Sequence, residues 1–393
     1  MRVLLSTGSS PRYMAPPTLG DEQVVCGPDW PEASAGGKVV SLASPSGRYD
    51  LGALARRLPS DQQPDVVVCL VDASLRNEPR NLGRFTCPKV LLVADTHHLD
   101  DPIVKLVRYA RSEPFDRVVL VYDRHHHLFF RAAGIASLFW FPGLTFPHGD
   151  AEVRAARSAA RARGLAFVGQ ASDLHPRRAR LAAALAASGL PFEIRRLSQA
   201  DGLRFYGGRT CGFNASLNAD LNLRVFEILA SGAALLTDAL GKESGLDAVG
   251  ADGRELLTYR SEEDLIEKAR ALMADPRLAE DIGRRGAAWF DSHFSAEARR
   301  AAFRALAFDG VAPPAFPLPS SAETPPADSD KLKRTIRAYQ KLQEIHRVAE
   351  TAVISAPAAL PSWVRALCET LPRIRWAPEG APEADFRGAS LDS

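Results

Sequence analysis

Three asparagines and an arginine–glutamate pair stand together in one stretch of the chain, and their chemistry suits a nucleotide. Asn214, Asn218 and Asn222 interrupt a run of small residues, and the segment NLRVFEILASG follows with apolar residues at helical spacing. Gly232 then ends the helix, and the next residues predict a short buried strand that finishes at Asp238. The sequence therefore predicts a polar loop, a helix and a strand in that order.

The first turn of that helix carries the side chains with the clearest chemistry. In an open α/β sheet, ligands lie at the carboxyl ends of the strands and face the first turns of the following helices. Asn222, Arg224 and Glu227 lie in or next to this turn. A guanidinium can hold phosphate oxygens in a fork, and a carboxylate can accept both hydroxyls of a ribose. The alternative is an ordinary core helix whose arginine and glutamate form a structural ion pair.

The segment NLRVFEILASGAALLTD resembles the C-terminal signature of the GT-B glycosyltransferases. It is most similar to the CgeB-like branch of the group 1 enzymes, whose pattern runs N-x-R-x-F-E-x-x-A-x-G-x-x-x-L-x-D. The resemblance implies two Rossmann-like domains facing an interdomain cleft and a nucleotide-diphosphate sugar as donor, with Glu227 on the nucleotide ribose. Many group 1 enzymes carry a second acid in a Glu-x7-Glu pair. Here Ala219 occupies the position of the first acid, with Asp220 beside it. The sequence therefore departs from the family pattern at the residue that usually contacts the donor sugar.

A second polar segment directly follows a buried strand predicted over 89–94. Its order, Asp95-Thr96-His97-His98, resembles the aspartate–histidine stretch of several GT-B transferases, in which a histidine touches the donor sugar or the acceptor. Asp95, His97 and His98 are therefore the predicted catalytic residues. A metal site is one alternative, but GT-B enzymes generally need no bound metal, and we predict none. The other alternative is a solvated loop whose later aspartates cap the next helix.

Three histidines in a row begin the helix that follows a strand predicted over 117–122. His125, His126 and His127 come directly after the polar pair that starts at Asp123. Consecutive side chains on a helix point in different directions, so the three histidines cannot all bind one metal. Either one of them faces the cleft, or together they form the polar first turn of the helix.

A strand predicted over 165–170 and a helix predicted over 173–188 place Gly169 at the turn between them. A residue without a side chain lets a diphosphate approach the backbone at such a turn. The resembling families place their donor diphosphate at a similar strand-turn-helix, and Arg177 or Arg178 lies near enough to neutralise it. The predicted donor-binding residues are Gly169, Arg177, Asn214, Asn222, Arg224 and Glu227.

The composition limits the class of protein. The chain has 393 residues, of which 46% are hydrophobic and 24% charged, as expected for a soluble protein with two domains of ordinary size. A net charge of +2 does not indicate that the protein binds nucleic acid or an anionic membrane. No apolar stretch reaches transmembrane length, the first residues do not form a signal peptide, and five scattered cysteines favour a reducing compartment. We expect a cytoplasmic protein, and the Ala/Arg-rich composition suggests a bacterial one.

Alternating strands and helices organise the chain. Short Val- and Leu-rich runs over 3–5, 65–71, 89–94 and 117–122 alternate with helical patterns, which implies a parallel, doubly wound sheet in an α/β fold. Residues 11–48 are rich in Pro, Gly and Ser and are predicted to be mostly loop, to which the runs over 24–25 and 38–42 can add short strands. The predicted domains are an acceptor-side Rossmann-like domain over 1–150, a Rossmann-like donor domain over 151–308, a Pro-rich linker over 309–330 and a helical and irregular extension over 331–393.

An apolar stripe marks the helix predicted over 331–353 in the extension. Leu332, Ile336, Tyr339 and Leu342 recur at helical spacing. An isolated helix of this length is marginal in water, so the stripe needs a cover. We expect it to dock on a partner chain, on the protein's own surface or on a second copy of the chain.

These patterns predict a glycosyltransferase that moves a sugar from a nucleotide-diphosphate donor to a glycan, protein or small-molecule acceptor, which the sequence does not identify. The resemblance further implies retention of anomeric configuration and no cofactor. One rival is a GT-B protein that has lost activity and serves as a nucleotide-sugar binding or scaffold protein. The other is a sugar-nucleotide epimerase on the same fold. Release of free nucleoside diphosphate from a panel of nucleotide sugars separates the three.

Overall fold

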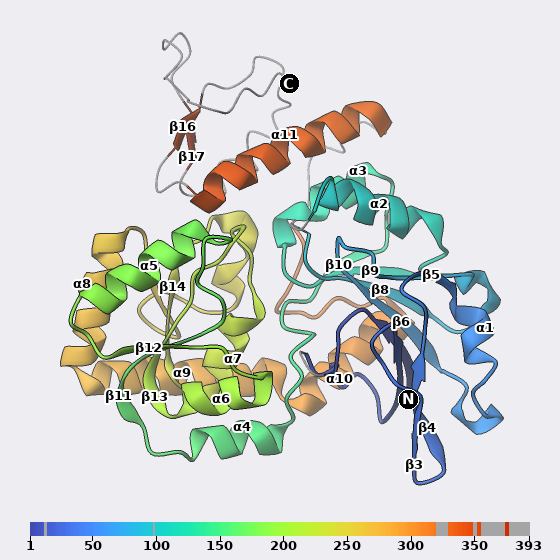
Figure 1. The fold of residues 1–393 in the computed structure, drawn as a ribbon, viewed down its shortest axis with the longest axis horizontal. Helices are drawn as coiled ribbons and strands as arrows, with labels where there is room; N and C mark the ends of the chain where they lie inside the picture. Colours follow the sequence, from blue (N-terminus) through green and yellow to red (C-terminus); the bar gives the residue numbers. More distant parts are fainter. Residues whose placement is uncertain (12–13, 97–98, 320–328, 349–351, 355–373, 377–393) are drawn as a thin grey trace. The chain divides into compact units, whose positions relative to one another are not determined.

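The computed structural model describes residues 1–11, 14–96, 99–319, 329–348, 352–354 and 374–376 (Figure 1). The chain divides into two compact units that are not continuous in sequence. Unit 1 comprises Met1–Ala155, Ser198–Leu203 and Phe290–Ser321, and unit 2 comprises Ala156–Leu197, Arg204–Trp289 and Ala322–Ser393. The chain first leaves unit 1 after Ala155 and returns to it at Phe290, and the predicted domain limits at 150 and 308 stay predictions.

Unit 1 is built on an eight-stranded sheet in the order β10-β9-β8-β6-β1-β2-β4-β3, in which only β3 is antiparallel to its neighbour. Every residue of β6 and β8 is buried, which explains their nearly continuous Val and Leu runs. The strands are β1 (Arg2–Thr7), β2 (Glu22–Gly27), β3 (Ala33–Ala35), β4 (Lys38–Ala43), β6 (Val66–Val71), β8 (Lys89–Val93), β9 (Arg117–Leu120) and β10 (Leu138–Trp140), with a separate parallel pair β5 (Gly47–Asp50) and β7 (Asn77–Arg80).

The strand order of this sheet reverses direction once. From β1 the chain adds β2 and β4 on one side, and it then returns to add β6, β8, β9 and β10 on the other. The loops that leave β1 and β6 therefore run to opposite faces of the sheet and open a crevice at their carboxyl ends. This edge of unit 1 is where a ligand site is expected on topology alone.

Helices and an aromatic cluster complete unit 1. Phe316 lies in the segment predicted as linker, yet it is only 2% exposed. Its ring centroid lies 5.5 Å from that of Trp140, 6.0 Å from that of Phe141 and 5.4 Å from that of Phe294. A buried phenylalanine holds the first part of this segment against the unit. The helices are α1 (Leu51–Ala55), α2 (Pro102–Ser112), α3 (His127–Ala132), α4 (Asp150–Arg157) and α10 (Ala296–Arg304), with single turns at Ser60–Gln62, Leu82–Arg84 and Arg124–His126 and a π-turn at Ala305–Asp309.

Unit 2 is built on a five-stranded, wholly parallel sheet in the order β12-β11-β13-β14-β15. Its core includes Leu165, Phe167, Phe213, Leu236 and Tyr259. The strands are β11 (Ala162–Val168), β12 (Phe192–Arg195), β13 (Arg209–Phe213), β14 (Ala234–Asp238) and β15 (Leu257–Tyr259). The helices are α5 (Pro176–Ala187), α6 (Gln199–Gly207), α7 (Leu223–Ser231), α8 (Glu262–Ala274) and α9 (Pro276–Phe294), with single turns at Lys242–Ser244 and Leu246–Ala248.

The structure confirms the α/β class and most of the predicted elements, and it differs at two places. The region 11–48, predicted to be mostly loop to which the runs over 24–25 and 38–42 can add short strands, contains β2 and β4 at those two runs and, beyond the prediction, β3 and the start of β5. The Arg/Ala-rich segment over 154–164, whose composition also predicts a helix, is helical only as far as Arg157, and β11 begins at Ala162. Helix propensity is high along most of the segment, but its second part pairs with β13 and is therefore a strand.

The predicted C-terminal helix is α11 (Ser329–Val348), and its stripe is covered. Leu332 is 8% exposed, Ile336 1%, and Tyr339 and Leu342 are fully buried. The helix lies against α5 of unit 2, so a surface of the same chain provides at least part of the cover. A short parallel pair, β16 (Ala352–Ile354) with β17 (Ile374–Trp376), follows.

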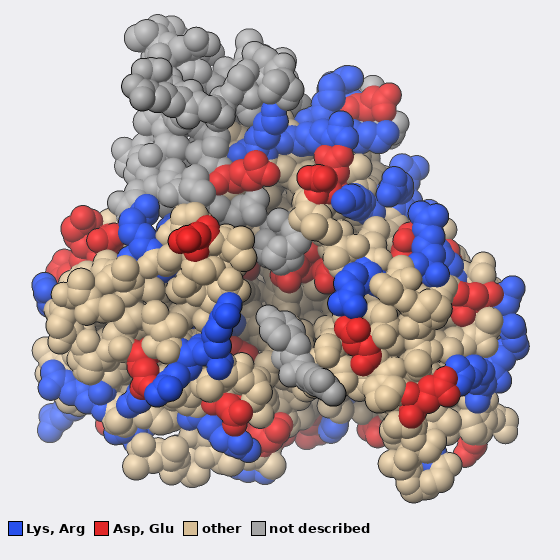
Figure 2. Space-filling model, viewed as in Figure 1, with Lys and Arg blue, Asp and Glu red and all other residues tan. Residues whose placement is uncertain are grey.

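Two observations concern what the surface and the helices offer. On the face drawn in Figure 2, acidic and basic side chains are interspersed rather than gathered into a patch of one sign. Of the helices in the described ranges, none combines the length and the apolar character that crossing a bilayer requires.

Candidate functional site

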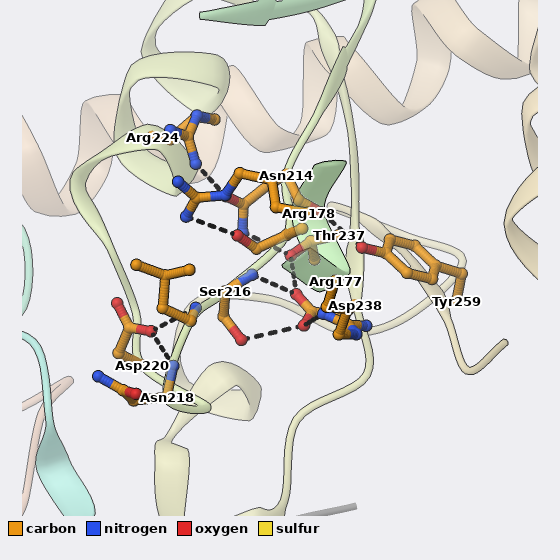
Figure 3. Close-up of polar contacts among 12 residues, drawn as sticks. Arg177, Arg178, Asn214, Ser216, Asn218, Asp220, Arg224, Thr237, Asp238 and Tyr259 are labelled. Atoms are coloured by element: carbon orange, nitrogen blue, oxygen red, sulfur yellow. Dashed lines mark hydrogen bonds and ion pairs between the residues drawn. The ribbon is translucent and has the colours of Figure 1, made fainter. Parts of the chain in front are cut away.

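The end of β14 anchors the loop over 214–222, which we call the amide loop. Asp238, only 2% exposed, accepts hydrogen bonds from the backbone N–H and the Oγ of Ser216, both at 3.0 Å (Figure 3). Arg177 of α5 forms a buried ion pair with the same carboxylate, also at 3.0 Å. Arg177, predicted to bind donor, therefore ties α5 to the strand end that anchors the amide loop, and its predicted contact with a diphosphate stays a prediction.

Arg224 joins the carboxyl ends of three strands. Its Nε donates to the carbonyl of Val168 at 2.9 Å, and its Nη1 donates to Oδ1 of Asn214 at 3.0 Å. The amide of Asn214 in turn donates to Oγ1 of Thr237 at 2.9 Å. The guanidinium lies 4.4 Å from the ring centroid of Phe167. The first turn of α7 is therefore fixed to β11, β13 and β14 together.

Gly169 follows the last residue of β11. The structure explains why a glycine occupies this position, which the sequence alone did not. Its φ is +145°, in the region that favours glycine. A Cβ at this position would lie 2.6 Å from Nη2 of Arg224. The space beside the glycine backbone is thus occupied by a guanidinium, which the turn presents at the carboxyl edge of the sheet.

Arg178 and Arg224, which we call the arginine pair, both lie near the ring of Phe167. Arg178 lies 5.8 Å from the centroid of the same Phe167 ring and donates only to the carbonyls of Gln170 and Ala215. Burial, and then the charge of Arg224, lower the pKa of Arg178 to about 9. Within the described residues neither guanidinium has a carboxylate at ion-pair distance. A bound anion would offset both the repulsion between the two guanidiniums and the cost of removing their charges from water.

The amide loop carries buried polar atoms that the described chain does not satisfy. Both side-chain polar atoms of Asn218 and both of Asn222 are buried without a hydrogen-bond partner there. Asn222 is the N-cap residue of α7, yet its side chain does not cap the helix. A buried polar group left without a partner costs about 1–3 kcal/mol, so four such atoms around one helix start indicate a ligand.

The loop's geometry explains the departure from the Glu-x7-Glu pattern. Ala219 stands at the position of the first acid, with a φ of +59°, and is buried. The neighbouring Asp220 uses its Oδ1 to accept from the backbone N–H groups of Leu217 and Asn218, at 3.1 and 3.0 Å. Its carboxylate thus forms the turn of the loop.

Glu227 lies one helical turn beyond the start of α7 and is half-buried. Burial raises the pKa of its carboxyl to about 7, and the charge of Arg224 opposes part of this effect. The carboxylate makes no hydrogen bond or ion pair within the described ranges, so its acceptor capacity is available to a ligand. This is the environment that a ribose-binding carboxylate requires, because the ligand's hydroxyls replace the water that burial removes.

Of the predicted catalytic residues, His97 and His98 lie outside the described residues. Asp95 follows β8 and lines a cavity of unit 1. The adjacent Thr96 is buried, donates to Oδ2 of Asp123 at 2.5 Å, and lies 2.8 Å from Nδ1 of His126. The aspartate–histidine segment is therefore tied to the strand end that carries the three consecutive histidines.

The three histidines are all buried, and two of them form a cluster with Asp123. One ligand atom from each of Asp123, His125 and His126 lies within 4.8 Å of the others, a grouping that can hold a metal ion. Thr96 already hydrogen-bonds two members of this cluster. Burial lowers the pKa of His125 to about 3 and that of His127 to about 4, so both imidazoles are neutral at pH 7. The prediction of no metal is untested.

Sequence reasoning missed the polar residues around the cavity in unit 1. They include Ser9 and Ser10 after β1, Asp72 after β6, and Asp29 with Arg76. The Gly/Ser turn after the first strand was visible in the sequence, but nothing in its spacing indicated that these loops converge. Strand order alone brings them together. Sequence reasoning also missed Asp238 as the anchor of the amide loop.

The comparisons with known proteins agree with this geometry. Residues 154–305 match a family model described as glycosyl transferase-like. Sucrose-phosphate synthase from Thermosynechococcus elongatus superposes with a TM-score of 0.53 at 12% identity, covering 78% of this chain and 98% of that one. HepE from Anabaena, solved in complex with UDP-glucose, gives 0.51 at 11% identity, covering 77% and 98%. No curated protein sequence matches the chain.

These matches, together with the two parallel sheets, establish the fold. Both neighbours are covered almost over their full lengths, and strands alternate with helices in unit 2 from β11 to α7 and in unit 1 from β8 to β10. The sequence match covers the arginine pair, the amide loop and Glu227 in unit 2. The chain has the GT-B fold, and its second unit carries the sequence features of a glycosyl transferase-like domain.

Proposed function

We propose that this protein is a glycosyltransferase that moves a sugar from a nucleotide-diphosphate donor to an acceptor. The observation that carries the proposal is the arginine pair without a counter-charge, beside an α7 whose first turns bear Asn222 and Glu227 without partners in the described chain. The arginine pair fits the diphosphate, Asn222 fits the donor sugar, and Glu227 fits the ribose. The family match over 154–305 supports the same assignment.

The proposed chemistry is stabilisation of a leaving nucleoside diphosphate. Negative charge grows on the diphosphate as the sugar departs, and the arginine pair and the N-terminus of α7 stabilise it where water is excluded. Fixed guanidiniums supply the positive charge, so the proposal includes no bound metal and no cofactor. By the resemblance to group 1 enzymes we also propose retention of configuration. The CgeB-like branch, a bacterial source and a cytoplasmic location stay predictions from the sequence.

The test is release of nucleoside diphosphate by the full-length protein from a panel of nucleotide sugars, together with calorimetric titration of the nucleotides. UDP-glucose is the first donor to try, because the HepE structure contains it. Arg178→Gln should weaken nucleotide binding by about 10–100-fold, the effect of losing a charged hydrogen bond. Arg180→Gln, an exposed arginine on the same helix, is the matched control. Failure of every nucleotide to bind would overturn the proposal.

One observation favours a second candidate, a nucleotide-sugar binding protein without transferase activity. Ala219 replaces the first acid of the usual pair, and Asp220 is engaged in the turn of the amide loop. A protein of this kind would bind the same nucleotides with the same dependence on Arg178, yet release no diphosphate and transfer no sugar. An epimerase would instead convert one nucleotide sugar to another without releasing the nucleotide, and chromatography of the products detects it.

A further inference from the structure

The backbone at the start of the amide loop is bonded to elements of unit 2 that surround it. The N–H of Asn214 donates to the carbonyl of Leu236 in β14 at 2.8 Å, and its carbonyl accepts from the hydroxyl of Tyr259 in β15 at 2.9 Å. The carbonyl of Ala215 accepts from Arg178 of α5 at 3.1 Å. The first residues of the loop are therefore held by the sheet and by a helix, and these contacts exist without a ligand.

Asp238 holds the next residue of the loop with both oxygens of its carboxylate. Its Oδ1 accepts from the backbone N–H of Ser216, and its Oδ2 accepts from the hydroxyl of the same serine (Figure 3). Oδ2 also pairs with Arg177. A buried ion pair often adds little net stability compared with apolar residues of similar size. The conformation that this pair fixes is therefore a better explanation of its presence than stability alone.

The tip of the loop is fixed as well, but its carboxamide is not. The N–H groups of Leu217 and Asn218 both donate to Oδ1 of Asp220. The Asn218 side chain is fully buried, and neither of its polar atoms has a hydrogen-bond partner in the described chain. A loop whose backbone is satisfied while a buried side-chain amide is not has the arrangement expected of a binding site that is ordered before its ligand arrives.

We propose that Asp238 is a positioning residue, whose carboxylate holds the amide loop in its binding conformation before a ligand binds and so places Asn218 for the donor sugar. The identity of the ligand rests on the proposed function, whereas the preformed loop does not. Because the loop is already ordered, its contacts with a sugar are not offset by the entropy cost of ordering it. Asp238 acts through the loop and not on the reacting atoms.

Hydrogen exchange of the ligand-free, full-length protein tests whether the loop is preformed. Peptides that cover 216–218 should be protected in the parent protein, and they should exchange about tenfold faster in Asp238→Asn, because the charged acceptor of the Ser216 N–H is lost. Peptides of α7 should keep their protection in both proteins. Unprotected loop peptides in the parent, or equal exchange of the loop in the two proteins, would overturn the proposal.

Calorimetry with UDP and UDP-glucose tests the consequence for the sugar. The ratio of the two dissociation constants isolates the contribution of the sugar, because the nucleotide is common to both ligands. Asp238→Asn should weaken binding of UDP-glucose relative to that of UDP by about tenfold, the effect of losing the charged hydrogen bonds that position the loop. An unchanged ratio would remove the positioning role.

A pair of serine variants keeps the proposal testable if Asp238→Asn does not fold. Ser216 and Ser231 are both buried, and each hydroxyl donates one hydrogen bond, to Asp238 and to the carbonyl of Ile228 respectively. Ser216→Ala should speed exchange of the loop and lower the relative affinity for UDP-glucose by about threefold. Ser231→Ala, at the far end of α7, should lower the thermal midpoint similarly but leave both readouts unchanged. The same response in both variants would contradict the proposal.

The two ligands also keep this inference apart from the proposed function. Failure of the parent protein to bind UDP or UDP-glucose would count against the proposed function, and with it against the role of Asp238 toward a donor sugar. Binding of both ligands, with loop exchange and the ratio unaffected by Asp238→Asn and Ser216→Ala, would leave the proposed function and remove the inference about Asp238.

Discussion

The two units use one architecture with opposite electrostatics. In unit 2 the carboxyl edge of the parallel sheet presents the arginine pair, whose guanidiniums donate to carbonyl and amide oxygens and, within the described residues, have no carboxylate at ion-pair distance. In unit 1 the described residues that line the cavity at the same edge include three carboxylates and one arginine, which pairs with Asp29. A doubly wound sheet thus supplies the place for a ligand, while the residues on the loops after the strands select its charge.

The largest expected effect tests whether the unit 2 site depends on close contact between a glycine and an arginine. Gly169→Ala places a Cβ 2.6 Å from Nη2 of Arg224, so the guanidinium must move. Calorimetry should show a loss of nucleotide affinity of 100-fold or about 3 kcal/mol, combining displacement of the cation with backbone strain. In an Arg224→Ala background the same substitution should cost far less affinity. Equal costs in both backgrounds would show that the contact is irrelevant to binding.

A pair of truncations tests whether the units are independent. Removing the chain after Phe308 deletes Phe316 from its cluster with Trp140, Phe141 and Phe294 in unit 1, and loss of a buried phenylalanine costs about 3–5 kcal/mol. Removing the chain after Pro319 keeps Phe316. The shorter protein should show the lower thermal midpoint of unit 1, while nucleotide affinity in unit 2 stays the same in both. A longer form that loses nucleotide binding would show that α11 supports the site.

The carboxylate of Glu227 provides a smaller and pH-dependent effect in unit 2. Glu227→Gln should weaken nucleotide binding by about 1.5–3 kcal/mol, the cost of a lost charged hydrogen bond. The pKa of Glu227 is raised by burial to about 7, and binding favours the carboxylate. Affinity of the parent protein should therefore rise as the pH increases from 6 to 8. The Glu227→Gln variant lacks this carboxyl, so its pH profile shows the effect of nucleotide protonation alone. An identical pH profile for the two proteins would exclude a role of Glu227 in binding the ribose.

The histidines of unit 1 should respond to pH in the stability of the fold rather than in binding. The pKa of His125 is lowered by burial to about 3 and that of His127 to about 4, whereas an unfolded histidine titrates near 6.5. The unfolded state therefore takes up the protons first, and stability is present above pH 6.5 and is lost as the pH falls towards 4. Each histidine contributes a slope of about 1.4 kcal/mol per pH unit. Thermal midpoints between pH 7 and 4.5 should fall less steeply in His125→Asn.

The sequence predicted unit 2 better than unit 1, for a physical reason. In unit 2 the loop, helix and strand that form the site are consecutive, so Asn222, Arg224 and Glu227 were recognisable by spacing within one helical turn or two. In unit 1 the cavity collects single residues from several strand ends, and only the strand order brings Ser9, Asp29 and Asp72 together. The position of Arg177 shows the other limit. Its charge was predictable, whereas its buried partner at the end of β14 depends on the sheet register.

The unsatisfied amides of the amide loop have a consequence for how finely the protein distinguishes its ligands. A site that merely fills with apolar surface rejects a poorer ligand weakly, whereas a site with buried donors and acceptors penalises any ligand that leaves them unmatched. Asn218 and Asn222 together present two carbonyl oxygens and two amino groups for which the described chain offers no partner. A deoxygenated analogue that leaves one of these groups empty loses about 1–3 kcal/mol. In the proposed donor site we therefore expect the loop to distinguish hydroxyl stereochemistry, since an epimer would direct the same hydroxyl away from the amide group that could bind it.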